Sequence, residues 1–188
     1  ATVTNVNFDP KRYRAWIKEA VERREALRTR AQAHCKQVHG TEACGSDLPE
    51  HATWKPKTYD LKILELKGQL VGVMADPELD EDVRSLRELI VYGLKGLAAY
   101  TDHAYVLEHT NEDMLAFIQE ALDATTDADL TVTDLVDLVM KTGGMGVEAM
   151  RLLDEANTSA YGIPEPTEVD LGVRSGPAIL VSGHDLRD

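Results

Sequence analysis

The sequence predicts a mainly α fold, a helical bundle domain followed by a C-terminal β-strand that would begin an α/β domain. Apolar residues recur at spacings of three and four over most of residues 9–155, the period of an amphipathic helix. Gly and Pro gather at residues 37–60 and 161–176, and one continuous apolar run of strand length follows at 177–182. We therefore expect a helical domain at 1–160 with a loop at about 37–60, a linker at 161–176, and the first strand of a truncated α/β domain at 177–188.

The first predicted helix runs from Asp9 to about Lys36. Asp9 is followed by Pro10, and this pair is typical of a helix start, because an Asp side chain can cap the helix and Pro lacks an N–H that would stay unsatisfied there. After the loop, residues 60–73 fit a short helix and an extended segment equally well, so both readings stay open.

The strongest helical pattern begins at Leu79 and continues to Val106. Gly93 and Gly96 lie on its surface, three residues apart. Since glycine has no side chain, we expect these positions to let a neighbouring helix approach closely.

Three more helices are predicted before the linker. One follows Thr110, whose hydroxyl can cap, and another follows Thr131 and ends at the Gly143-Gly144 pair. The last spans 145–155. The short connections predict a compact antiparallel bundle, with the helix that starts after Asp9 packed against it.

Composition excludes several classes of protein. The chain has 33 Asp and Glu against 20 Lys and Arg, a net charge of −13 that argues against binding nucleic acid or anionic lipid by bulk charge. No apolar stretch is long enough to span a membrane, and the N-terminus does not resemble a signal peptide. With only two cysteines, we expect a cytoplasmic protein rather than a disulfide-stapled secreted one.

One cluster has the residue types of a zinc site. His34, Cys35, His39 and Cys44, with His51 nearby, offer the nitrogen and sulfur ligands that Zn²⁺ prefers. The spacing differs from that of the usual zinc knuckles, and adjacent residues of a helix point to different faces. A solvated helix end with incidental thiols is therefore the stronger interpretation.

Other titratable groups have ordinary explanations. His103 and His109 lie near a predicted helix end, where the helix dipole favours them. The carboxylates of residues 76–88 and 123–137 are expected on solvated faces. No dinucleotide-binding, P-loop, nucleophile-elbow or HExxH motif is present in the sequence.

His184 is the remaining candidate site residue. It follows Gly183 on the turn after the predicted strand, and in open α/β sheets ligands bind at the carboxyl ends of strands. A histidine placed there can reach a bound group or a metal.

Several motifs in register along the whole chain resemble the hybrid-cluster proteins, also called prismane proteins or hydroxylamine reductases. They are ATVTNVNFD (1–9), DVRSLREL (82–89), GLKGLAAY (93–100), MKTGGM (140–145), LDEANT (153–158), YG (161–162) and ILVSGHDL (179–186). The similarity is weakest over residues 33–79.

The resemblance implies an iron–sulfur oxidoreductase that reduces hydroxylamine to ammonia, or reduces nitric oxide, with electrons from a redox donor. It implies a helical domain of two three-helix bundles followed by two α/β domains, an N-terminal iron–sulfur cluster, and a hybrid iron–sulfur–oxygen cluster. The family's hybrid-cluster histidine lies in the Ser-Gly-His-Asp-Leu motif, so the resemblance makes His184 a ligand of that cluster.

The chain departs from the family pattern at both ends. It starts after the family's N-terminal cysteines and ends before the remaining hybrid-cluster ligands, and Cys35 and Cys44 match no family ligand. The resemblance therefore implies that the 188 residues alone hold no cluster and are inactive. Two alternatives stay open: a stand-alone acidic helical interaction module, and a small zinc-binding protein that uses the His34 to Cys44 cluster.

Overall fold

The computed structural model describes residues 9–41, 48–72, 76–168, 171–172 and 175–179, and all regular structure in these ranges is helical. The helices are α1 (Pro10–His39), α2 (Glu50–Thr53), α3 (Leu61–Gln69), α4 (Glu81–Val106), α5 (Glu112–Ala124) and α6 (Val132–Tyr161). The prediction of a mainly α protein is thus confirmed.

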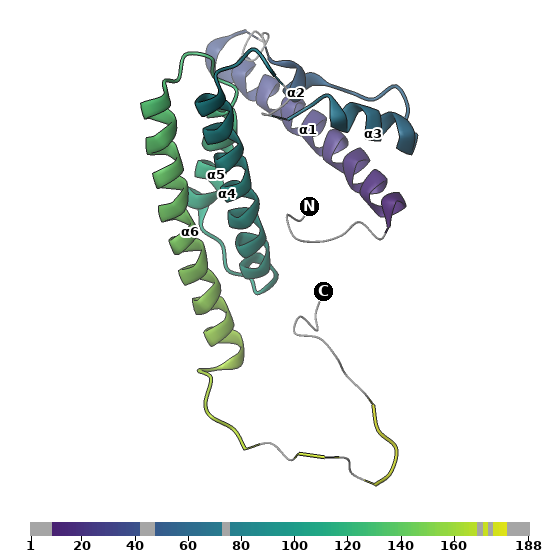
Figure 1. Cartoon of the computed structure of the whole chain (residues 1–188), viewed down its shortest axis with the longest axis vertical. Helices are drawn as coiled ribbons and strands as arrows, with labels where there is room; N and C mark the ends of the chain where they lie inside the picture. The colour runs from purple at the N-terminus through teal and green to yellow at the C-terminus, as the bar shows by residue number, and fades with distance from the viewer. Residues whose placement is uncertain (1–8, 42–47, 73–75, 169–170, 173–174, 180–188) are drawn as a thin grey trace.

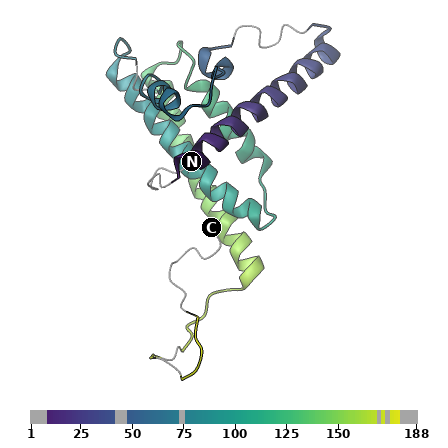
Figure 2. The same ribbon diagram turned by 90° about the vertical axis from the view of Figure 1, so that its right-hand side faces the viewer.

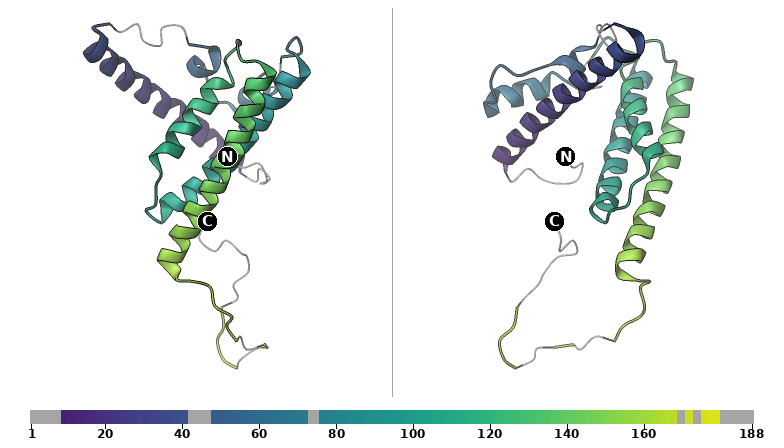
Figure 3. Two further views of the ribbon diagram at one scale, coloured as in Figure 1. Left: turned by 90° about the vertical axis from the view of Figure 1, so that its left-hand side faces the viewer. Right: turned by 180° about the vertical axis from the view of Figure 1, so that it is seen from behind.

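Helices α4, α5 and α6 form a three-helix bundle in which α4 and α6 run parallel and α5 runs antiparallel to both (Figures 1 and 3). Its core consists of buried apolar side chains, which are spaced by three and four along α4 and α5: Ile90, Leu94, Leu97, Met114, Phe117, Ala121, and from α6 Leu135 and Ala149. Burial of each large apolar side chain contributes roughly 1.5–3 kcal/mol, so this core is the main source of stability in the bundle.

Helices α4 and α6 approach closely at Gly93. A Cβ atom at this position would lie 2.8 Å from Cγ2 of Thr142, whereas a Cβ at Gly96 would meet nothing within 4 Å. The prediction of a close approach is therefore confirmed for Gly93 and wrong for Gly96, which faces open space.

Helix α1 lies apart from the bundle and diverges from it (Figures 1 and 2). Among the described residues it packs against α3 and contacts none of the bundle helices, so the predicted packing of this helix on the bundle is wrong. The reason lies in its surface: charged residues surround α1, and Cys35 is its one buried residue in the described part of the chain. An apolar stripe wide enough to bury against the bundle is missing.

Aspartate caps fix the starts of three helices. The Asp9 carboxylate accepts from the backbone N–H of Lys11 and Arg12, both at 3.1 Å, as predicted for α1. Asp80 caps α4 in the same way. The Asp60 side chain accepts from the backbone N–H groups of Lys62 and Ile63 and caps α3. Of the two readings of residues 60–73, a short helix or an extended segment, the structure therefore has the helix.

Two predicted boundaries differ from the structure. The cap of α5 is Asn111, whose Oδ1 accepts from Met114 N at 3.0 Å, and not Thr110. Helix α6 continues through Gly143 and Gly144, where two helices were predicted. Its packed face keeps the helical period on both sides of the pair, and this tertiary contact outweighs the roughly 1 kcal/mol that each glycine costs.

The segments between and after the helices also correct details of the prediction. The expected loop at 37–60 contains the last turn of α1 and the short helix α2. Residues 177–179 form no strand, and the rest of the predicted strand lies outside the described residues.

Candidate functional site

A cavity of about 910 Å³ lies between the α2–α3 segment and one end of the bundle. Glu50, Trp54 and Lys67 line it from the α2–α3 side, and Arg87 and Thr125 line it from the bundle. The cavity is where the two separately packed parts of the chain face each other.

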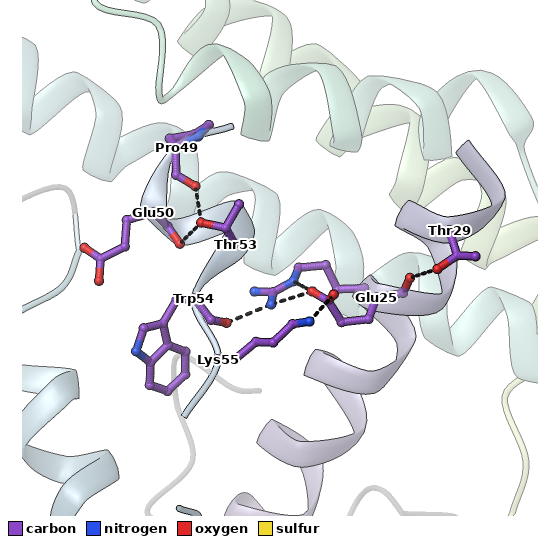
Figure 4. Close-up of polar contacts among 8 residues, drawn as sticks. Glu25, Thr29, Pro49, Glu50, Thr53, Trp54 and Lys55 are labelled. Atoms are coloured by element: carbon purple, nitrogen blue, oxygen red, sulfur yellow. Dashed lines mark hydrogen bonds and ion pairs between the residues drawn. The ribbon is translucent and has the colours of Figure 1, made fainter. Parts of the chain in front are cut away.

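A polar network fixes the α2–α3 side of this cavity to α1 (Figure 4). Arg24 Nη2 donates to the backbone oxygen of Trp54 at 2.7 Å and pairs with Glu25 at 2.9 Å, while Lys55 Nζ lies 2.5 Å from the other Glu25 oxygen. Lys55, and to a lesser degree Arg24, lower the pKa of Glu25 because they hydrogen-bond its charged form. The carboxylate therefore stays ionised and holds the segment around Trp54 against α1.

Trp54 and the ends of α2 and α3 are joined by Lys67. Its ammonium lies 5.8 Å from the centroid of the Trp54 ring and 2.7 Å from Glu50 Oε1. Since the ion pair is largely exposed on the Glu50 side, it contributes little to stability, about 0–1 kcal/mol.

On the bundle side, Arg87 is buried and its Nη2 donates to the backbone oxygen of Asp127. Thr125 and Thr126 donate their hydroxyls to carbonyls of the preceding turn, at 2.7 and 2.8 Å. Arg87 Nη2 and the two hydroxyls are satisfied by the backbone and fix the α5–α6 connection. The buried Arg87 Nε, in contrast, has no hydrogen-bond partner among the described residues. The lining mixes cations with carboxylates and presents no nucleophile paired with a base among the described residues.

His184, the predicted cluster ligand, lies outside the described residues. Its role therefore stays a prediction.

The described residues of the proposed zinc cluster do not come together as a metal site. His34 and His39 lie on the exposed surface of α1, while Cys35 is buried, disulfide-bonded, and has its Sγ 3.0 Å from Thr41 O. Cys44 lies outside the described ranges. Within those ranges, no three His, Cys, Asp or Glu side chains are grouped so that they could hold a metal ion.

The histidines at the end of α4 have structural surroundings. His103 is exposed, and His109 Nδ1 lies 2.8 Å from Leu107 O, a contact that fixes the turn after the helix. Among the acidic residues, Asp134 has a defined role as the N3 partner of Thr131 in a capping box.

Arg87 is the structurally important residue that sequence reasoning missed. It lies on the same face of α4 as Ile90 and Leu94, at the spacing of the buried residues. A charged residue on an otherwise apolar stripe was the available signal, because a buried guanidinium needs a hydrogen-bond acceptor.

Comparison with known proteins identifies relatives along the whole chain. The model of a family described as the Prismane/CO dehydrogenase family matches residues 1–188. Three relatives named hydroxylamine reductase align with 100% of this chain. They come from Kosmotoga olearia (54% identical), Halothermothrix orenii (51%) and Nitratidesulfovibrio vulgaris (49%). The chain spans 33% of the length of each. No helix in the described part of the chain is long and apolar enough to cross a membrane.

Proposed function

Because the chain belongs to the Prismane/CO dehydrogenase family, we propose that it is the helical part of an iron–sulfur oxidoreductase that reduces hydroxylamine to ammonia. The observation that carries this proposal is the match of residues 1–188 to the family, with about half of all residues identical to proteins named hydroxylamine reductase. The chain spans a third of those relatives, so the activity would belong to a longer gene product.

The proposed reaction takes up two electrons and two protons. The N–O bond of hydroxylamine breaks, its nitrogen leaves as ammonia, and its oxygen leaves as water. The electrons come from a separate redox donor. Reduction of nitric oxide is the second activity that we retain for the same protein, and we expect both in the cytoplasm.

The cofactors of this proposal are an iron–sulfur cluster and a hybrid iron–sulfur–oxygen cluster, which would supply the electron transfer and the substrate-binding metal. The described residues do not fit as ligands, because no three metal-binding side chains are grouped among them. We therefore assign ligation to His184 and to residues beyond this chain, and no step of the reaction to the helices.

The helices would instead cover the cluster and exclude water. Exposed apolar residues support this role: Leu89 and Tyr92 on α4, and Val136, Met140 and Val147 on α6, are 42–71% exposed. These residues lie outside the buried core of the bundle. Exposed apolar surface of this extent on a helix is typical of one that packs against further protein.

A His184→Ala variant of the intact gene product tests the ligand assignment. We expect loss or disorder of the hybrid cluster, with lower iron content and no hydroxylamine turnover. His103→Ala is the matched control, because His103 is exposed on α4 and has no assigned role. Normal iron content with full turnover in His184→Ala would show that this residue is not a ligand.

The 188-residue chain alone is expected to be inactive and to bind neither iron nor zinc in stoichiometric amounts when purified without air. Elemental analysis measures this directly. Stoichiometric zinc that disappears in Cys44→Ser would favour the zinc-binding alternative, and stoichiometric iron would contradict the assignment of ligands beyond the chain.

A further inference from the structure

The two parts of the molecule carry opposite charge. Helix α1 has nine Lys and Arg against three Glu, whereas residues 81–161, which hold the bundle, have five Lys and Arg against 16 Asp and Glu. The structure keeps these parts separate, since α1 contacts none of the bundle helices among the described residues. The basic charge of α1 is thus not neutralised by the acidic bundle.

Three of the basic residues share one side of α1. Arg12, Arg23 and Arg30 are 11 and 7 residues apart, which places them within about 20° of one another around the helix axis at 100° per residue. Arg23 pairs with Glu19 at 2.6 Å, an exposed ion pair of the kind that is easily exchanged for another. We call this side the arginine face.

Apolar side chains lie directly beside the arginines. Trp16 and Leu27 follow Arg12 and Arg23 by one helical turn and are 42% and 56% exposed. The Arg12 guanidinium carbon lies 4.8 Å from the centroid of the Trp16 ring. Tyr13, Trp16, Ile17 and Ala20 line a depression of about 370 Å³, large enough for an apolar side chain of a partner.

We propose that the arginine face docks a small acidic electron-carrier protein that reduces this enzyme. The inference rests on the proposed function, since a hydroxylamine reductase needs a donor of electrons. Guanidinium groups bind carboxylates in bidentate geometry, and Arg and Trp are the residues that most often dominate binding energy at interfaces. Outside α1 the chain has 11 Lys and Arg against 30 Asp and Glu, and this acidic remainder repels an acidic protein. The basic face on α1 therefore selects one orientation of approach.

The test measures binding of a purified two-cluster ferredoxin to the intact gene product that contains this chain, at low and at high salt. We expect the triple variant Arg12→Glu, Arg23→Glu and Arg30→Glu to weaken binding at least about tenfold at low salt. The control is Lys57→Glu, Lys62→Glu and Lys95→Glu, which makes the same change of net charge at exposed positions off the arginine face. The control triple is expected to change binding much less.

Three outcomes would overturn the proposal. The first is equal weakening of binding by both triple variants, which would indicate a general charge effect. The others are no ferredoxin binding at any salt concentration, and an arginine face that binds only anionic vesicles or a second copy of the protein.

Circular dichroism checks that both triple variants keep their helices. Hydroxylamine reduction with reduced methyl viologen, a small donor that needs no docking, tests the enzyme separately. Turnover with methyl viologen but no ferredoxin binding would leave the proposed function standing and remove only the docking site.

Discussion

Gly93 lets α4 and α6 approach, and this contact can be tested by adding one methyl group. In Gly93→Ala the new Cβ would meet Cγ2 of Thr142, whose hydroxyl is held by Leu138 O at 2.8 Å and cannot turn away freely. We expect the overpacking to outweigh the better helix propensity of alanine, with a net loss of about 1–2 kcal/mol in the free energy of unfolding.

Gly96→Ala is the matched control for this contact, because a Cβ at Gly96 meets nothing within 4 Å. It should raise the free energy of unfolding by up to about 1 kcal/mol. Urea denaturation followed by circular dichroism measures both variants. Equal stabilisation by the two substitutions would mean that the helices are farther apart at Gly93 than described.

Thr131 and Asp134 make a pH-dependent contribution at the start of α6. The Thr131 hydroxyl lies 2.5 Å from Asp134 Oδ2, and this hydrogen bond, with that of the Thr131 N–H, lowers the pKa of Asp134 below its usual value. A carboxyl with a lowered pKa stabilises the fold above its unfolded pKa, and the contribution is lost as the pH falls through the folded value.

Thr131→Val removes the larger cause of this shift and leaves the backbone N–H in place. We expect the pKa of Asp134 to rise toward its usual value, so that less stability is lost on acidification through the range in which the carboxyl titrates. An NMR titration of the Asp134 carboxyl carbon reads the pKa directly. An unchanged midpoint would show that the hydroxyl does not act on this group.

At the scale of the elements, α6 passes through Gly143 and Gly144 without a break. A Cβ at either position would lie in open space. The double variant Gly143→Ala and Gly144→Ala should therefore raise the free energy of unfolding by about 1–2 kcal/mol, since alanine favours a helix interior. Thermal unfolding followed by circular dichroism tests this, and lower stability of the variant would indicate a break or kink at the pair.

The helices could be predicted wherever an apolar period and a cap coincide. Asp9 with Pro10 predicted the start of α1, and the apolar pattern up to Val106 predicted α4. The split of α6 was wrong because local propensity was given more weight than its face of Leu135, Thr142 and Ala149, which continues across the glycines.

Tertiary placement was harder to predict than the elements. The spacing of apolar residues along α1 does not tell which neighbour the helix packs against. Its charged surface explains why, among the described residues, α3 contacts it and no bundle helix does. The hydrogen bond from Arg87 to Asp127 O joins residues 40 apart in sequence, so the sequence shows a buried charge without its acceptor. The role of His184 rests on the motif that contains it and on family membership.

At the scale of the whole molecule, the described structure consists of an acidic three-helix bundle and a basic α1–α3 part that meet around a cavity. Neither part groups metal ligands among its described residues. The chemistry proposed for the longer gene product therefore depends on His184 and on residues outside this chain, and the helical part is expected to determine access and docking.

The most direct test of the central claim is the stoichiometry of hydroxylamine turnover by the intact gene product, purified without air and supplied with reduced methyl viologen. We predict that each hydroxylamine consumed yields one ammonia and oxidises two molecules of reduced methyl viologen, as the two-electron cleavage of the N–O bond requires. A protein that contains its iron but forms no ammonia from hydroxylamine would contradict the claim that this chain belongs to a hydroxylamine reductase.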